Sequence, residues 1–121
     1  MKPIGYTLKN LSRLDYFKKH LEIVTIILPG SITKTEILVL ASFMSLQGDI
    51  VADDRFGTSA RKIVRDKLKM SPGGLGNHLR SLEDNKYIYK NDKGKFEINK
   101  YLIPSSEKVQ SYQFNIVCNE Q

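Results

Sequence analysis

The chain has 121 residues, which is enough for one compact domain and too few for two ordinary ones. It is 40% hydrophobic and 26% charged and has no low-complexity tract, a composition that excludes an intrinsically disordered chain. Its formal net charge of +6 favours a polyanionic partner, either nucleic acid or an acidic membrane surface, and charge alone does not distinguish the two.

The sequence offers little for disulfide, metal or membrane chemistry. Cys118 is the single cysteine, so no intrachain disulfide can form, which fits a reducing cytoplasm. The two histidines, His20 and His78, are far apart in the sequence, so we expect no metal site and no cofactor. Residues 1–10 lack the apolar segment of a secretory signal, and the apolar run Ile23–Leu28 is too short to span a bilayer. We therefore expect a cytoplasmic protein without a membrane partner.

The first part of the chain divides into an arm and a strand. Residues 1–20 are basic and mixed, and we interpret them as a loose N-terminal arm followed by a short helix or turn. The run from Leu21 to Leu28 is β-branched and apolar, and Pro29-Gly30 ends it. Such a run predicts a strand, and we place the main domain, with this preceding strand included, at residues 21–104.

A buried helix is predicted next. Thr33 and Glu36 have the spacing of a capping box, in which each side chain bonds the other residue's backbone N–H. Residues 37–46 are apolar on nearly every side of the helix, which is typical of a central, buried element. The stretch from Asp49 to Gly57 reads as a loop, with Asp53-Asp54 as solvated polar markers and not as a metal or acid pair.

Two further helices and a hairpin follow. Thr58 or Ser59 is predicted to cap the first helix, whose apolar positions are Ala60, Ile63, Val64 and Leu68. After a break at Lys69-Met70, Ser71 and Pro72 suit the N-cap and first turn of a helix whose buried stripe is Leu75, Leu79 and Leu82, and Asn85-Lys86 ends it. Strands are then predicted at residues 87–90 and 95–99, joined by the turn Asn91–Gly94.

The end of the chain is predicted to be an extension, residues 105–121. Tyr101–Pro104 closes the hairpin unit, and Ser105–Ser111 reads as a polar linker. Tyr112–Val117 alternates well enough for a last strand. We expect this strand to pair with Ile23–Leu28, within the chain or across a dimer.

The segment from Leu68 to Ile88 has a distinctive order of features. A leucine and a methionine precede a serine-capped helix, two leucines follow three residues apart, and a short polar turn leads into a tyrosine–isoleucine step. This order resembles the winged helix-turn-helix regulators of bacteria and phages, over about half of the chain. The resemblance implies an α+β fold, a winged helix-turn-helix with a three-helix core and a β-hairpin wing, to which we add flanking N- and C-terminal strands. It implies that helix 71–85 enters the major groove of double-stranded DNA and that hairpin 87–99 is the wing.

The proposed recognition helix has the polar outer face that a major-groove helix needs. Asn77 can pair with an adenine edge, and Arg80 with a guanine or a phosphate. Glycines allow close approach of the backbone, although each weakens a helix by roughly 1 kcal/mol relative to alanine. The predicted outer face consists of Gly73, Gly74, Asn77, Arg80, Ser81 and Asp84. Two further contacts with DNA are predicted for this helix, one from Ser71 at its N-terminus and one from His78.

Basic residues gather in the same part of the chain. From Arg55 to Lys100 there are twelve basic and five acidic residues, a local excess of +7 against +6 for the whole chain. The helix before the break supplies the predicted DNA contacts Ser59, Arg61, Lys62 and Arg65. The hairpin supplies Lys90, Lys93 and Lys95, which can touch phosphates or a minor groove and are equally typical of a solvated turn.

Several alternatives stay open. Helix 71–85 can be an ordinary amphipathic surface helix, His78 is better explained as a packed or boundary residue than as a ligand or base, and Tyr87, Tyr89 and Phe96 fit hairpin packing better than base stacking. No nucleophile and base can be combined, so we do not expect an enzyme. The main hypothesis is a homodimeric regulator of transcription or replication with recognition helices on the order of 34 Å apart. The alternatives are a protein-interaction module that binds a host or replication factor and, less favoured, an RNA-binding domain.

Overall fold

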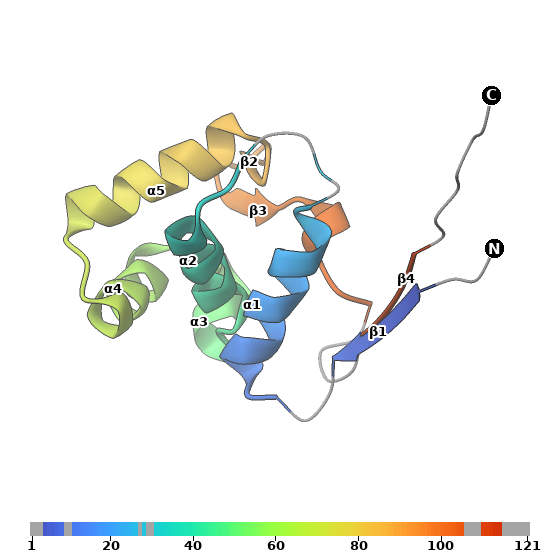
Figure 1. The fold of residues 1–121 in the computed structure, drawn as a ribbon. Coiled ribbons are helices and arrows are strands. Elements are labelled where there is room, and N and C mark those ends of the chain that lie inside the picture. The colour runs from blue at the N-terminus through green and yellow to red at the C-terminus, as the bar shows by residue number, and fades with distance from the viewer. Residues whose placement is uncertain (1–3, 9–10, 27, 29–30, 106–109, 115–121) are drawn as a thin grey trace.

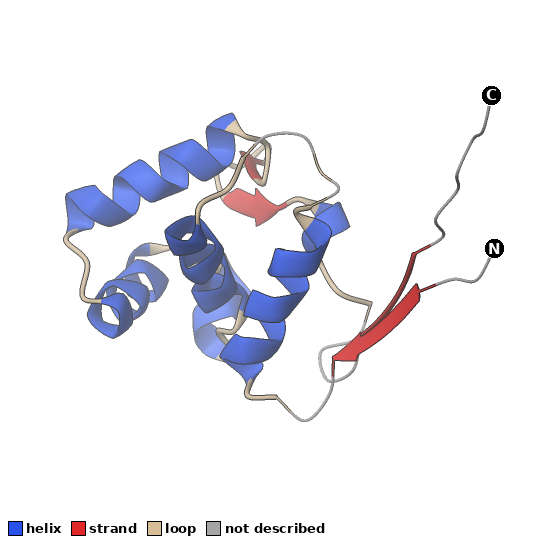
Figure 2. Cartoon of the chain, in the orientation of Figure 1, coloured by secondary structure: helices blue, strands red, loops and turns tan. Residues whose placement is uncertain are grey.

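The structure is a computed structural model that describes residues 4–8, 11–26, 28, 31–105 and 110–114. Within these residues it contains five α-helices and two separate two-stranded antiparallel sheets, an α+β fold (Figure 1). Figure 2 shows the helices gathered on one side and the ribbon of terminal strands projecting from them. None of the described helices is both long and apolar enough to cross a membrane.

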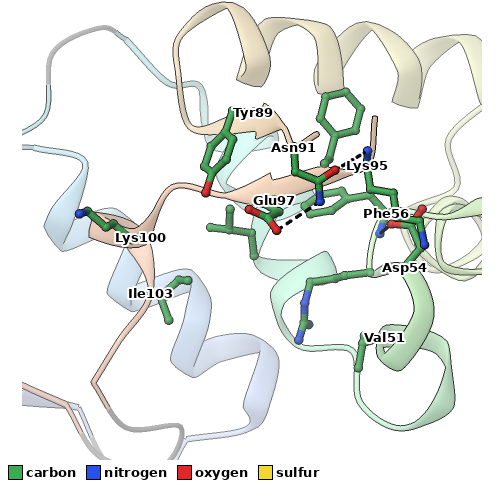
Figure 3. Close-up of a pocket in the computed structure, with 12 residues that line it drawn as sticks. Val51, Asp54, Phe56, Tyr89, Asn91, Lys95, Glu97, Lys100 and Ile103 are labelled. Carbon is green, nitrogen blue, oxygen red and sulfur yellow. Dashed lines mark hydrogen bonds between the residues drawn. The ribbon is translucent and has the colours of Figure 1, made fainter. Parts of the chain in front are cut away.

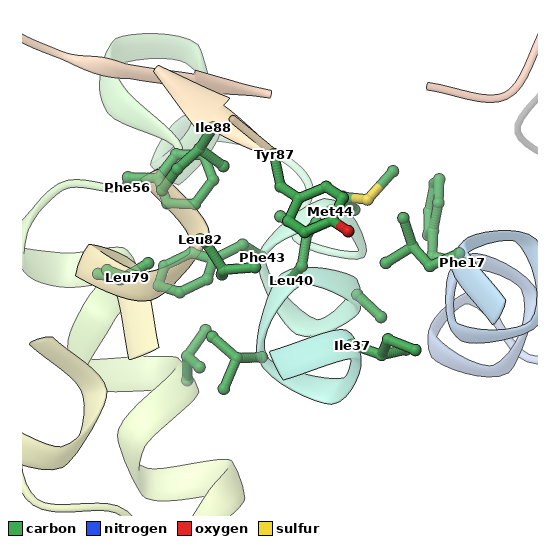
Figure 4. Packing of buried hydrophobic residues seen from close by; sticks show 14 of the residues in the cluster. Phe17, Ile37, Leu40, Phe43, Met44, Phe56, Leu79, Leu82, Tyr87 and Ile88 are labelled. Carbon is green, nitrogen blue, oxygen red and sulfur yellow. The ribbon is translucent and has the colours of Figure 1, made fainter. Parts of the chain in front are cut away.

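The central element is α2 (Lys34–Met44), and the predicted capping box begins it. Thr33 N–H donates to Glu36 Oε1 and Glu36 N–H donates to Thr33 Oγ1, both at 3.1 Å. The helix buries Val39, Leu40 and Phe43 completely, and α1, α4 and α5 all pack against it (Figure 4). The prediction of a central buried helix is confirmed, although the helix ends at Met44, two residues earlier than expected.

The first helix, α1 (Arg13–Val24), corrects the prediction of a strand at Leu21–Leu28. Ser12 caps the helix by accepting a hydrogen bond from the Asp15 N–H, and Leu21–Val24 forms its last turn. The buried residues are Tyr16, Phe17, His20 and Leu21, which share one helical face against α2. Burial of this face outweighs the β preference of Ile23 and Val24, since strand propensity spans only about 1 kcal/mol. In the remainder of the predicted strand, Thr25 and Ile26 form a turn and Leu28 lies in a bend, and only residue 27 lies outside the described residues.

A short helix, α3 (Asp49–Asp54), replaces most of the loop predicted at Asp49–Gly57. Phe56 follows it and is buried, with its ring stacked on Phe43 at a centroid distance of 4.6 Å. The turn is therefore ordered by an aromatic contact with α2 that a local reading of its acidic residues does not reveal.

The next two helices are α4 (Thr58–Leu68) and α5 (Pro72–Asp84). The predicted cap of α4 is wrong, because Gly57 is the N-cap and makes no side-chain hydrogen bond. Ala60 and Val64 are buried as expected, whereas Ile63 is exposed. Lys69 ends α4 in the left-handed conformation, with φ +56°.

The start and inner face of α5 match the prediction. Ser71 Oγ accepts from the Gly74 N–H at 3.0 Å, and Pro72 occupies the first helical position. Leu75, Leu79 and Leu82 are all buried. The break and the leucine stripe together set the helix across α2 and α4.

The hairpin pairs β2 (Ile88–Lys90) with β3 (Phe96–Ile98), as predicted. Asn91 Oδ1 accepts from the N–H groups of Lys93 and Lys95, and Gly94 has φ +75°, which favours glycine. A 3₁₀ turn, η1 (Lys100–Leu102), then buries Leu102 against the body.

The chain ends pair with each other. β1 (Ile4–Leu8) lies antiparallel to β4 (Gln110–Phe114), and Figure 1 shows this ribbon projecting from the α1 side of the molecule. The predictions of a loose arm over residues 4–8 and of pairing with Ile23–Leu28 are therefore wrong. β4 also begins inside the predicted linker, at Gln110, while residues 115–117 of the predicted last strand lie outside the described residues.

Candidate nucleic-acid interface

The faces of α5 define the candidate site. One face carries the buried leucines, and the opposite face carries residues at helical spacing that are all exposed: Gly73, Asn77, Arg80 and Asp84. The predicted outward orientation is confirmed for these four. A glycine, an amide and a guanidinium along one exposed face give α5 a surface that can approach a base edge closely.

A flank of α5 turns toward α2 and corrects part of the predicted outer face. Gly74, His78 and Ser81 are half-buried on this flank. The buried carboxylate of Glu36 faces it from α2: burial alone would raise the pKa of Glu36, but hydrogen bonding from Ser81 and Thr33, with the charge of His78, lowers it. Ser81 therefore lies half-buried on the flank of α5 that faces α2, and His78 occupies the boundary position that the sequence favoured.

The other flank of α5 borders a groove beneath the hairpin. The groove has a volume of about 410 Å³. Its charged lining residues are four cations and two carboxylates, namely Arg61, Arg80, Lys90, Lys95, Asp54 and Glu83. Gly76 and Gly94 line it from the helix and the hairpin turn. The groove is thus positively charged overall and adjoins the exposed face of α5.

Arg61 links the hairpin to α4. Arg61 Nε donates to the carbonyl of Phe56 at 2.7 Å, and its guanidinium lies 5.9 Å from the centroid of the Phe96 ring on β3. Lys90 Nζ lies 5.4 Å from the centroid of the same ring, a contact between paired residues of the hairpin. Both predicted DNA-contacting residues therefore already have contacts within the protein, and that of Arg61 joins α4 to the hairpin.

The remaining predicted DNA contacts lie on α4 and on the hairpin. Ser59 and Lys62 are exposed on α4, and Arg65 is half-buried there. Lys93 is exposed at the hairpin turn, and Lys95 is half-buried beside it. The structure therefore places the predicted cations on three elements, α4, α5 and the hairpin.

Two glycines of α5 have no packing role in the protein. A Cβ built on Gly73 or Gly76 meets nothing within 4 Å, whereas one on Gly74 lies 3.1 Å from Ser71 Oγ. Glycine inside a helix costs roughly 1 kcal/mol relative to alanine. The chain thus carries two helix-weakening residues that its own packing does not require.

Arg55 is a structural residue whose role the sequence does not reveal. Its Nη1 donates to the carbonyls of Phe43, Met44 and Leu46 at 2.9, 3.1 and 3.1 Å, at the C-terminal end of α2. Arg13 Nε donates to the neighbouring carbonyl of Ser45 at 2.8 Å. Cations are favourable at a helix C-terminus, but the partners are nine or more residues away in the sequence, so no local signal identifies them. Arg55 therefore does not belong to the surface charge excess in which it was counted.

The other chemistry considered from the sequence receives no support from geometry. Among the described residues, no group of three His, Cys, Asp or Glu side chains lies close enough to hold a metal ion. Tyr87 is buried, and Phe96 packs edge-on to Phe56 with ring centroids 6.0 Å apart, as hairpin packing predicts. Tyr89 is 46% exposed, so the packing predicted for it is wrong.

Comparisons of the chain with protein-family models, with curated proteins and with solved structures found no match.

Proposed function

We propose that the chain is a winged helix-turn-helix protein that binds double-stranded DNA as a homodimeric regulator of transcription or replication. In this proposal α5 enters the major groove and the β2–β3 hairpin is the wing. The observation that carries the proposal is the exposed face of α5, with Gly73, Asn77 and Arg80 in line and a positively charged groove on its flank.

The glycines support the same function. Gly73 lies at the N-terminal end of the exposed face, where its missing side chain leaves open space. A helix that enters the major groove comes closest to the bases at its N-terminal end. Clearance for DNA gives a reason for glycine at this position that the packing of the isolated chain does not give.

The exposure and contacts of each polar side chain predict its role in DNA binding. Arg80 and Asn77 are exposed on α5 and read base edges, where a bidentate pair contributes about 1–3 kcal/mol of discrimination. Lys93 and Lys62 are exposed on the hairpin turn and on α4 and contact phosphates without regard to sequence. Arg61 acts as a positioning residue, because its guanidinium is occupied by Phe56 and Phe96.

The test begins with selection of duplexes from a random pool, followed by salt titrations of binding to the selected duplex. Arg80→Ala and Asn77→Ala are expected to weaken binding roughly 5- to 150-fold and to relax the preference at one position each. Lys93→Ala is expected to weaken binding equally on all sequences and to reduce the salt slope by about 1. Gly73→Ala is expected to weaken DNA binding while leaving the fold intact.

The matched control is Lys19→Ala, which removes a charge of the same sign from the exposed surface of α1, away from α5. Unchanged sequence preference in both Arg80→Ala and Asn77→Ala overturns the assignment of α5. Absence of duplex binding at low salt overturns the function as a whole and favours a protein-interaction module.

A further inference from the structure

A second groove lies on the side of the hairpin away from α5. It has a volume of about 420 Å³, and no described residue of α5 lines it. In Figure 3, Tyr89, Lys100 and Ile103 lie toward one side of this groove, Val51 and Asp54 lie toward the other, and Glu97 lies between. A molecule seated here would leave the exposed face of α5 free.

Large hydrophobic side chains are exposed around this groove. Six such side chains are exposed among the described residues, and three of them are Tyr89 (46% exposed), Tyr101 (68%) and Ile103 (54%). Tyr89 and Ile103 line the groove, and Tyr101 belongs to η1 between two lining residues, Lys100 and Ile103. We call these three residues the tyrosine patch. Gathered apolar side chains with a polar rim mark interaction surfaces, whereas single exposed ones are ordinary.

Five charged residues line the groove, and two of them, Glu97 and Lys100, are exposed beside the tyrosine patch. Glu97 accepts a hydrogen bond from Asn91 Nδ2 at 3.3 Å and is the partner of Tyr89 in the β2–β3 pair, where its carboxylate raises the pKa of Tyr89. Lys100 Nζ lies 5.3 Å from the centroid of the Tyr101 ring. The acid and the base are both exposed at the apolar patch, so the patch is complementary in charge to a second copy of itself.

Two-fold symmetry makes this complementarity specific. In an isologous interface, a residue of one copy meets a different residue of the other, and the reverse contact forms as well. Glu97 of each copy can then face Lys100 of the other, with the tyrosine patches in contact between the two ion pairs. Of the two strands that the sequence offered for a dimer contact, Leu21–Val24 is helical, and β4 pairs along one edge with β1 of its own chain.

We propose that the tyrosine patch is the homodimer contact and that its occupant is a second copy of the chain, with Glu97 of one copy opposite Lys100 of the other. This inference deepens the proposed function, since it names the surface through which the DNA-binding dimer forms. Its geometry leaves α5 of both copies free for DNA.

The first experiment measures the mass of the full chain by sedimentation equilibrium over a range of concentrations. The unaltered chain is expected to dimerise, and Tyr101→Asp and Ile103→Asp are each expected to weaken the dimer at least tenfold. The matched control is Ile26→Asp, since Ile26 is 81% exposed at the end of α1 and is not part of the patch. A chain that stays monomeric at every concentration overturns the proposal, as does a dimer that responds equally to Ile26→Asp.

The second experiment tests the charge pairing. Glu97→Lys and Lys100→Glu are each expected to be monomeric, because each places like charges opposite one another across the two-fold axis. Mixed together, with an affinity tag on one of them, the two variants are expected to copurify as a heterodimer whose two charge pairs are both restored. Glu97→Gln keeps an acceptor for Asn91 and is the control for damage to the hairpin. Failure of the mixture to associate overturns the pairing of Glu97 with Lys100.

The two proposals fail separately. A Tyr101→Asp monomer that still binds a single half-site supports DNA binding through α5 and attributes the loss to the dimer contact. A dimer that depends on the tyrosine patch but binds no duplex supports the contact and overturns the DNA-binding function. A dimer unaffected by any variant of the patch uses another surface and overturns the inference alone.

Discussion

The helical body around α2 and the β1–β4 ribbon are stabilised by different interactions. The body is held by apolar burial: Val39, Leu40 and Phe43 are fully buried on α2, and side chains from α1, α4, α5 and the hairpin enclose them. The ribbon contacts the body through Tyr112 of β4, whose hydroxyl bonds His20 Nδ1 of α1 and whose ring packs, partly buried, against the core. His20 is itself held in the body, because its Nε2 donates to the carbonyl of Leu102 in η1 at 2.8 Å. The burial that holds the body is non-directional and shared by many residues, whereas Tyr112 combines partial burial with one oriented hydrogen bond.

The difference predicts two levels of stability in one chain. A two-stranded ribbon is marginally stable by itself in water. We therefore expect the ribbon to open locally at a lower free energy than the body, which opens only on global unfolding. Amide hydrogen exchange separates the two levels, because it reports the opening of each strand and helix individually.

The largest effect is expected from Arg55→Ala, which acts on the body. Three carbonyls at the end of α2 lose a charged donor, although that of Phe43 keeps a backbone partner, the Leu46 N–H at 3.3 Å. A buried acceptor left without a partner costs about 1–3 kcal/mol. We expect the free energy of unfolding in urea to fall by about 2 kcal/mol, with faster exchange throughout the body. Arg55→Lys keeps the charge but not the planar group and is expected to recover only part of the loss. An unchanged urea midpoint for Arg55→Ala contradicts a structural role for this arginine.

A smaller and local effect is expected from Tyr112→Phe, which acts on the ribbon. The change removes only the hydroxyl that bonds His20 Nδ1. A hydrogen bond of this kind contributes about 1 kcal/mol, so the amides of β1 and β4 are expected to exchange roughly fivefold faster. Exchange in α2 and α5 is expected to stay unchanged. Equal acceleration of exchange in both regions shows instead that the ribbon and the body unfold as one unit, which contradicts two levels of stability.

The regions also differ in how far the sequence predicts them. The cap at Ser71, the stripe of Leu75, Leu79 and Leu82, and the turn Asn91–Gly94 are all correct, because each depends on residues within a turn or two of one another. The pairing of β1 with β4 joins residues more than one hundred positions apart, and neither strand carries a local signal for the other.

The candidate site shows the same limit. The exposed face of α5 follows from helical spacing and is correctly predicted at Asn77 and Arg80. The sequence predicts that Ser81 and Arg61 face DNA, but Ser81 faces Glu36 of α2 and Arg61 lies over the ring of Phe96. Both contacts depend on the tertiary arrangement. Local patterns therefore predict which face of a helix is outside, while packing decides which polar residues on it are already engaged.

The smallest effect is expected from pH, through His20. Burial lowers the pKa of His20 below its ordinary value of 6.5, and the hydrogen bond to Leu102, which raises it, limits the shift. The opened state therefore binds a proton more readily than the closed one, so the stability contributed by neutral His20 is complete above about pH 6.5 and declines as the pH falls below that value. We expect the exchange of β1 and β4 amides, corrected for its intrinsic pH dependence, to accelerate as the pH falls from about 7 to about 5. The variant His20→Gln has no group that titrates at this position, so its ribbon is expected to be less stable and to show no such acceleration. If the same acceleration occurs in this variant, the pH dependence comes from another group and the prediction for His20 is wrong.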